Sequence, residues 1–223
     1  RENILKIYTK DPEFRFFMSI QILLIVACTL VMISHQYFDS SWQDFEQVVF
    51  QAVSISTTTG YTTSNFAEWP SFVPMLLIIA SFIGGCAGSV GGGLRVARIL
   101  VLYLQGAREL KRFVHPNLVY PIKWGQNVLD ERVIGSIWAF FSAYLLVFTI
   151  CLLSVIACGV EPFDAFNAVL ASINNLGPGL GSVSSNMTAM PDSAKWVLTI
   201  AMVCGRLEIF TLLALFTPAF WKA

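Results

Sequence analysis

The chain has 223 residues, of which 56% are hydrophobic and 13% are charged, and its formal net charge is zero. A soluble domain carries about 25% charged residues, so this composition excludes an ordinary soluble protein. The mean hydropathy of +0.67 points the same way. We therefore predict an all-α integral membrane protein that contacts membrane lipid, and we expect no nucleic-acid partner.

Residues 16–36 are the first apolar segment. About 20 apolar residues in a helix cross a hydrocarbon core of roughly 30 Å, so this segment predicts a membrane span. The next run, residues 42–55, is too short to span and is predicted to re-enter the membrane and stop. Another long apolar stretch covers residues 72–104. The predicted order is span, re-entrant pore helix, loop, span.

The loop after the short run reads Ser-Thr-Thr-Thr-Gly-Tyr at residues 56–61. Threonine hydroxyls and backbone carbonyls can replace the water around a bare cation, and glycine adopts dihedral angles that other residues avoid. The composition is typical of a selectivity filter. The alternative is a polar turn between two helices.

The second half of the chain repeats this order. An apolar run covers residues 134–158, a short helix is predicted to begin at Pro162, and the polar segment 174–181 comes before a last span at residues 194–216. The predicted parts are a lead-in at 1–15, a first membrane-pore-membrane repeat at 16–105, a connector at 106–131 and a second repeat at 132–223.

Superposing Gly60 on Gly177 brings both short helices into register. Irregular backbone at membrane depth occurs only where it lines protein or a water-filled cavity, so the two loops should converge on an ion pore. A short helix whose carboxyl end points at that pore adds roughly half a negative elementary charge there. The predicted cation-binding residues of the filter are Thr58, Thr59, Gly60, Asn175, Leu176 and Gly177.

Both spans that follow the loops contain a feature that a plain membrane helix avoids. Glycines crowd residues 84–93, where a regular helix is improbable. An arginine, Arg206, stands in the last span, and an intramembrane arginine is a functional candidate. The alternative for the glycine-rich segment is a static kink that allows close helix packing. The alternative for Arg206 is an arginine without a transport role, whose charge is satisfied by backbone carbonyls or by an acid. The predicted gate residues are Gly88, Ser89, Gly91, Gly92, Gly93 and Arg206.

Basic residues gather in segments 1–15 and 95–132, whereas residues 37–74 contain acids and no lysine or arginine. The positive-inside rule therefore predicts that residues 1–15 and 106–131 face the cytoplasm. The filter side should face the periplasm.

Four motifs in this order resemble the carboxyl half of bacterial Trk-type potassium uptake proteins of the Trk/Ktr/HKT superfamily. They are Ser-Thr-Thr-Thr-Gly-Tyr at 56–61, Gly-Gly-Cys-Ala-Gly-Ser-Val-Gly-Gly-Gly-Leu-Arg at 84–95, Asn-Asn-Leu-Gly-Pro-Gly at 174–179 and Gly-Arg-Leu-Glu at 205–208. The resemblance covers nearly the whole chain.

This resemblance implies potassium uptake across a bacterial inner membrane, with sodium and rubidium as further candidate ions and no cofactor. It places Gly60 and Gly177 in the third and fourth of four repeats. It makes segment 84–93 an intramembrane gating loop and Arg206 its pore-lining partner. It also implies a homodimer with one pore in each subunit and a cytoplasmic, nucleotide-binding gating-ring protein as partner.

The chain departs from the family pattern because it has only two repeats, and two filter segments cannot surround an ion. The start at Arg1, without a methionine, favours a longer polypeptide. Pairing of two copies is the alternative. Competing functions are an ion-coupled secondary solute transporter and a non-conducting membrane scaffold. We do not expect an enzyme, because His35 and His115 lie near opposite membrane faces with no nucleophile beside them.

Overall fold

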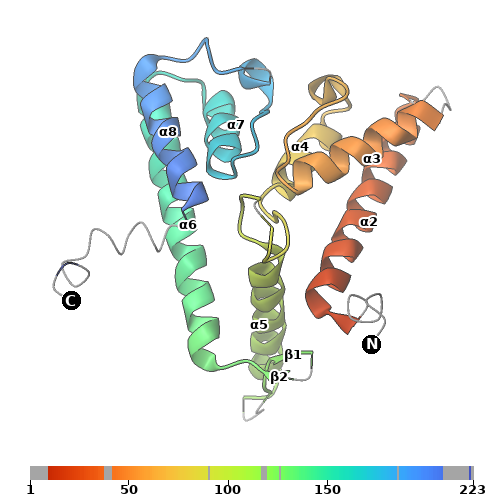
Figure 1. The fold of residues 1–223 in the computed structure, drawn as a ribbon, viewed down its shortest axis with the longest axis vertical. Coiled ribbons are helices and arrows are strands. Elements are labelled where there is room, and N and C mark those ends of the chain that lie inside the picture. The colour runs from red at the N-terminus through yellow and green to blue at the C-terminus, as the bar shows by residue number, and fades with distance from the viewer. Residues whose placement is uncertain are drawn as a thin grey trace.

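A computed structural model describes residues 10–37, 42–89, 91–116, 120–125, 127–184, 186–207 and 221. Its helices form two groups, one from each half of the chain (Figure 1). The first group is α2 (Pro12–Ser34), α3 (Trp42–Ser56) and α4 (Phe72–Ala80), and the second is α6 (Glu131–Ala157), α7 (Pro162–Ile173) and α8 (Asp192–Arg206). Helix α5 (Val96–Val114) lies between them and leads to the connector.

Helices α2 and α6 have 23 and 27 residues, and both are long and apolar enough to cross a membrane. An aspartate is the N-cap residue of each helix. The Asp11 carboxylate accepts a hydrogen bond from the Glu13 N–H at 3.1 Å, and the Asp130 carboxylate accepts one from the Arg132 N–H at 3.3 Å. Such a cap satisfies an N–H group that the first helical turn leaves open. The first spans of the two repeats therefore start in the same way, a few residues before the predicted positions.

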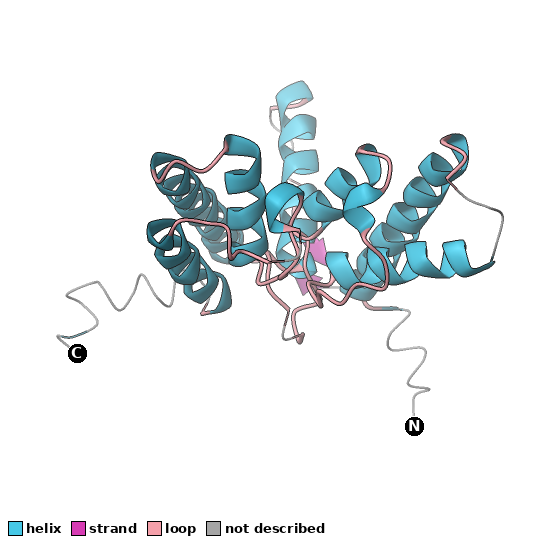
Figure 2. Cartoon of the chain, turned by 90° about the horizontal axis from the view of Figure 1, so that it is seen from above, coloured by secondary structure: helices cyan, strands magenta, loops and turns pink. Residues whose placement is uncertain are grey.

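The predicted pore helices, α3 and α7, have 15 and 12 residues. At 1.5 Å per residue they are about 22 and 18 Å long, which is less than the roughly 30 Å of a hydrocarbon core. Both end inside the molecule, where their loops meet between the two groups of helices in the view from above (Figure 2).

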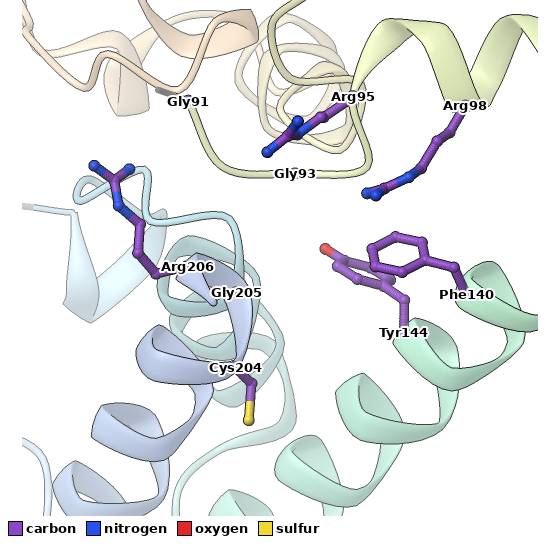
Figure 3. Close-up of a pocket in the computed structure, with 9 residues that line it drawn as sticks. All are labelled: Gly91, Gly93, Arg95, Arg98, Phe140, Tyr144, Cys204, Gly205 and Arg206. Carbon is purple, nitrogen blue, oxygen red and sulfur yellow. The ribbon is translucent and has the colours of Figure 1, made fainter. Parts of the chain in front are cut away.

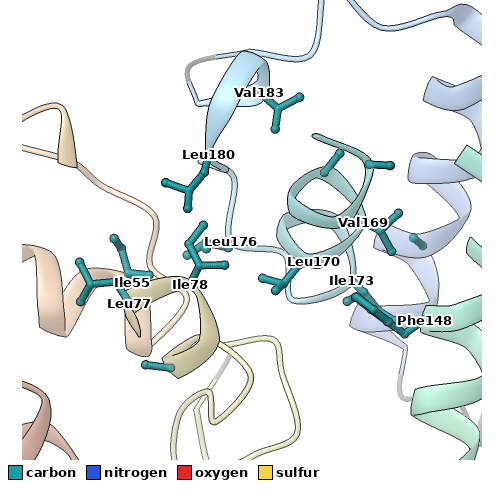
Figure 4. Packing of buried hydrophobic residues seen from close by; sticks show 14 of the residues in the cluster. Ile55, Leu77, Ile78, Phe148, Val169, Leu170, Ile173, Leu176, Leu180 and Val183 are labelled. Atoms are coloured by element: carbon teal, nitrogen blue, oxygen red, sulfur yellow. The ribbon is translucent and has the colours of Figure 1, made fainter. Parts of the chain in front are cut away.

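The main apolar core joins the two repeats (Figure 4). Ile55 at the end of α3 and Ile78 in α4 are fully buried, as is Leu170 in α7, and Leu176 lies beside Ile78. Lipid is as apolar as these side chains, so the hydrophobic effect does not drive their association. Close van der Waals packing holds the repeats together instead.

The second span of the first repeat is interrupted. Helix α4 ends at Ala80 and α5 begins at Val96, so the break at residues 81–95 contains the predicted segment 84–93 and extends it at both ends. We call residues 81–95 the intramembrane loop. Helix α8 has no such break and continues to Arg206. Residues 208–220, with Glu208 and the end of the predicted last span, lie outside the described residues.

The described part of the connector contains regular structure. Helix α5 continues to Val114, and an antiparallel ribbon of β1 (Lys123–Trp124) and β2 (Asn127–Val128) follows. These strands of two residues each are the only ones in the described residues, so the all-α fold class is confirmed. Short 3-10 turns, η1 (Phe66–Glu68) and η2 (Gly181–Val183), lie in the loops after the pore helices.

Candidate functional site

The first predicted filter loop, residues 57–61, which we call the first filter loop, continues from the last turn of α3. The Thr58 N–H donates to the Ile55 carbonyl at 3.1 Å, and the Thr59 N–H donates to the Ser54 carbonyl at 2.8 Å. Thr58 and Gly60 have φ angles of 57° and 81°. A β-branched residue at positive φ is uncommon, so the fold imposes this conformation on Thr58.

The second filter loop, residues 174–178, has the same backbone geometry. The Asn175 N–H donates to the Ser172 carbonyl at 3.0 Å, and the Leu176 N–H donates to the Ala171 carbonyl at 2.9 Å. Asn175 and Gly177 have φ angles of 52° and 99°. The loops therefore match residue for residue in the register that the alignment of the two glycines predicts.

The two filter loops touch at Gly60. A Cβ atom on Gly60 would lie 2.1 Å from the Leu176 carbonyl oxygen, which is too close for any side chain. A Cβ on Gly177 would have no atom within 4 Å. Gly60 is therefore needed both for its dihedral angle and for the contact between repeats, whereas Gly177 is needed for its dihedral angle alone.

A cavity lies on each side of the first filter loop. The outer cavity, of about 780 Å³, is lined by Gly60, Thr62, Thr63, Ser64, Asn65, Phe66, Gly177, Pro178 and Ser184. The inner cavity, of about 490 Å³, is lined by Phe17, Thr57, Thr58, Thr59, Gly85, Cys86, Ser89, Gly91 and Arg206. The filter loop thus separates two spaces, and its own three threonines, Thr57, Thr58 and Thr59, line the inner one.

The intramembrane loop packs against the inner side of both filter loops. The Gly92 N–H donates to the Thr58 Oγ1 at 2.9 Å. A Cβ on Gly92 would lie 1.9 Å from the Asn174 carbonyl oxygen, and one on Gly91 would lie 3.0 Å from the Thr57 carbonyl oxygen. Only glycine permits this approach of three backbone segments.

The structure thus brings most of the predicted gate residues to the filter. Gly91 and Gly92 lie at its inner side, and Ser89 lines the inner cavity. Gly93 packs within the loop, where a Cβ would lie 2.9 Å from the Ser81 carbonyl oxygen. Gly88 is exposed near the tip of the loop, where a Cβ would meet nothing within 4 Å. Gly88 therefore has no packing reason to be glycine in this conformation.

Arg206 lies at the carboxyl end of α8 and lines the inner cavity. Together with Arg95 and Arg98 it also surrounds a smaller polar cavity, which holds Tyr144 and Phe140 on its opposite wall (Figure 3). The Arg98 guanidinium sits 3.9 Å from the centre of the Phe140 ring. Three positive side chains from α8, the intramembrane loop and α5 thus line one cavity below the filter loops.

The residue before Arg206 fixes the position of α8. A Cβ on Gly205 would lie 1.8 Å from the Ile173 carbonyl oxygen, so α8 packs directly on the end of α7. This contact keeps Arg206 close to the second filter loop.

Sequence reasoning missed a buried polar network behind the filter. The Tyr144 hydroxyl donates to the Asn174 Oδ1 at 2.6 Å, and the Asn174 Nδ2 donates to the Ser81 Oγ at 2.9 Å. All three side chains are buried. A polar residue inside a predicted span is a weak signal for such a partner. Only the fold reveals which residues pair.

Two repeats of span, pore helix and filter-like loop, whose loops meet between two cavities, define a membrane protein of the pore-loop transport class. The chain matches the TrkH family model, described as cation transport protein, over residues 6–223. The chain belongs to this family, which consists of transporters and not of enzymes.

Several potassium uptake proteins are similar to this chain. The Trk system potassium uptake protein TrkH of Vibrio parahaemolyticus is 57% identical over 98% of this chain and 45% of its own length. TrkH of Escherichia coli K12 is 56% identical over the same shares, and TrkG of that strain is 34% identical over 96% of this chain and 44% of its own length. The chain therefore spans less than half the length of the curated relatives it matches.

A solved structure confirms the fold. The crystal structure of the potassium transporter TrkH from Vibrio parahaemolyticus superposes with a TM-score of 0.91 at 57% sequence identity. The match covers 96% of this chain and 46% of that chain.

Proposed function

We propose that this chain supplies two of the filter segments, and the gate, of a potassium uptake protein. The observation that carries the proposal is the matched geometry of the two filter loops, with positive φ at Thr58 and Gly60 and again at Asn175 and Gly177. Alternating backbone conformations of this kind can direct successive carbonyls toward one side of a loop. The relatives named as potassium uptake proteins support the choice of ion.

Selection of the cation rests on carbonyl oxygens and helix ends. The carbonyls of Thr58, Thr59, Asn175 and Leu176 are the proposed ligands of a partly dehydrated potassium ion. Helices α3 and α7 end at the filter loops, so each adds roughly half a negative elementary charge near the ion. A monovalent cation is favoured because these dipoles supply partial charge and no carboxylate is among the proposed ligands.

Gating is assigned to the intramembrane loop and Arg206. Gly91 and Gly92 pack against the inner side of the filter loops, which supports a role for the loop in obstructing the path of the ion. Arg206 lines that cavity and places a positive charge on the path of the ion. Displacement of the loop opens the path.

The wider assembly is proposed from the resemblance to the same family. We propose a multi-pass protein of the bacterial inner membrane with the filter loops on the periplasmic side and residues 106–131 in the cytoplasm. The complete pore then holds four repeats, two of them in the remainder of the polypeptide. A homodimer and a cytoplasmic nucleotide-binding gating-ring protein complete the assembly.

Rubidium flux into liposomes that hold the full-length protein tests this function. We expect Gly60→Ser to abolish flux, because its side chain meets the Leu176 carbonyl. Gly177→Ser should reduce flux less, because it adds only strain of about 1–3 kcal/mol at positive φ. Arg206→Ala should raise flux by removing a positive barrier.

The same experiment separates the alternatives. Flux that none of the three substitutions changes would contradict the pore and favour a scaffold. Saturable uptake of a small organic solute, coupled to an ion, would favour a secondary transporter.

A further inference from the structure

The tip of the intramembrane loop is hydrogen-bonded to a side chain from another helix. Glu13, in the first turn of α2, accepts a hydrogen bond from the Ala87 N–H through its Oε1 at 2.6 Å. The two residues are 74 positions apart in the chain. A hydrogen bond to a carboxylate is roughly twice as strong as one between neutral groups. Glu13 therefore holds the loop from outside.

Ala87 is also hydrogen-bonded to a residue of the intramembrane loop itself. The Ala87 carbonyl accepts a hydrogen bond from the Arg95 Nη1 at 3.0 Å. Arg95 lies at the other end of the loop and has a φ of 68°. Side chains of opposite charge thus bind the N–H and the carbonyl of Ala87, which fixes the tip.

Glu13 is itself firmly placed. Its N–H donates to the Asp11 carboxylate, which caps α2. Further along α2, the Gln21 Nε2 donates to the Ser56 Oγ at 2.7 Å, and both side chains are buried. Helix α2 is thus bonded to the loop tip at one point and to the end of the pore helix at another.

We propose that Glu13 is a positioning residue that holds the intramembrane loop against the filter. The inner part of the loop is bonded to the filter through Gly92 and Thr58, and Glu13 supplies the second anchor at the tip, near Cys86. Losing the Glu13 anchor releases the tip from the edge of the inner cavity. The consequence for ion flux rests on the proposed function, whereas the anchor itself does not.

The reactivity of Cys86, the neighbour of Ala87 in the loop, reports release of the tip. Cys86 is half-buried and lines the inner cavity. The full-length protein is treated with a water-soluble thiol reagent, and labelling at Cys86 is followed by mass spectrometry. The variants are Glu13→Ala, which removes the acceptor, and Glu13→Gln, which removes the charge but keeps an acceptor oxygen. Glu46→Ala, which removes an exposed carboxylate on α3, is the control.

We expect Glu13→Ala to label roughly threefold to tenfold faster than Glu13→Gln, as loss of one hydrogen bond predicts. Both variants remove the same charge, so any electrostatic effect of Glu13 on the thiol cancels in this comparison. Glu13→Asp keeps the charge but shortens the side chain, and it should also speed labelling. If Glu13→Ala fails to fold, the labelling rate of Glu13→Asp is used in its place. Glu46→Ala should label like the unchanged protein.

Equal labelling of Glu13→Ala, Glu13→Asp and Glu13→Gln would overturn the proposal. Rubidium flux through the same samples addresses the gate separately. Faster labelling with higher flux supports both the anchor and the gate. Faster labelling with unchanged flux supports the anchor and contradicts the role of the loop as gate.

Discussion

At the residue scale, Thr58 and Asn175 are the two non-glycine residues of the filter loops with a left-handed backbone, and their side chains make similar contacts. Thr58 accepts a hydrogen bond from Gly92 in the intramembrane loop, and the Asn175 Nδ2 donates to the Met202 carbonyl in α8 at 3.2 Å. Each side chain therefore ties its filter loop to the span that follows in the same repeat. These bonds help to offset the strain of about 1–3 kcal/mol that positive φ costs a non-glycine residue.

Replacement of Thr58 tests the hydrogen bond between its hydroxyl and the Gly92 N–H. Thr58→Val keeps the shape of the side chain but removes the acceptor, so the Gly92 N–H loses its partner. We expect hydrogen–deuterium exchange in the peptide that contains Gly92 to rise by roughly tenfold, as loss of one hydrogen bond predicts. Thr58→Ser keeps the hydroxyl and is the matched control. Exchange that is equal in both variants would contradict the bond.

At the element scale, the two repeats differ in their second spans. The first is broken into α4, the intramembrane loop and α5, while α8 is continuous as far as it is described. The glycine-rich composition explains the break, because glycine disfavours a helix and permits the turns at Gly84 and Gly93, which have positive φ. The detached α5 then needs its own attachment to the second repeat.

One such attachment is the pair of Arg108 in α5 and Glu131 in α6. The Arg108 side chain is only 3% exposed, and its Nη2 donates to the Glu131 Oε2 at 3.1 Å alongside a second bond to the same carboxylate. A buried charge without its partner is strongly unfavourable. We expect Glu131→Ala to lower the melting temperature in detergent more than Glu109→Ala, which removes a longer contact of 3.5 Å to the same arginine. Equal decreases in melting temperature for the two variants would contradict a role of the Arg108–Glu131 pair in attaching α5 to α6.

At the scale of the whole molecule, polar contacts between the repeats accompany the apolar core. Tyr144 of α6 and Ser81 at the start of the intramembrane loop both bond to Asn174, whose backbone carbonyl packs against Gly92. In lipid, an unpaired polar group finds no water as a substitute partner. The network therefore fixes how the two repeats face one another.

Tyr144→Phe tests the contribution of this network. The substitution removes the hydroxyl that donates to the Asn174 Oδ1 and leaves that atom buried. We expect a loss of stability of about 1–3 kcal/mol, measured by thermal unfolding in detergent. Tyr103→Phe, on the exposed side of α5, should leave the unfolding temperature unchanged. A Tyr144→Phe protein as stable as the original would show that the Tyr144 hydrogen bond does not stabilise the network.

The sequence by itself determined the kind of protein and the order of its parts. Apolar segments of spanning length, a helix too short to span and a polar loop follow from composition and length, which act locally. Aligning Gly60 with Gly177 also placed the turn residues correctly, because positive φ is a local demand that few residue types meet. The break at residues 84–93 was predictable for the same reason.

The tertiary structure decided which of these parts touch. Nothing local indicates that Gly92 lies against Asn174, that Ala87 bonds to Glu13, or that Tyr144 completes a network with Asn174. Such contacts join residues far apart in the chain, and their partners are chosen by packing between helices. Gly60 shows both levels at one position: its dihedral angle is a local property, whereas the carbonyl that excludes a side chain there belongs to the other repeat.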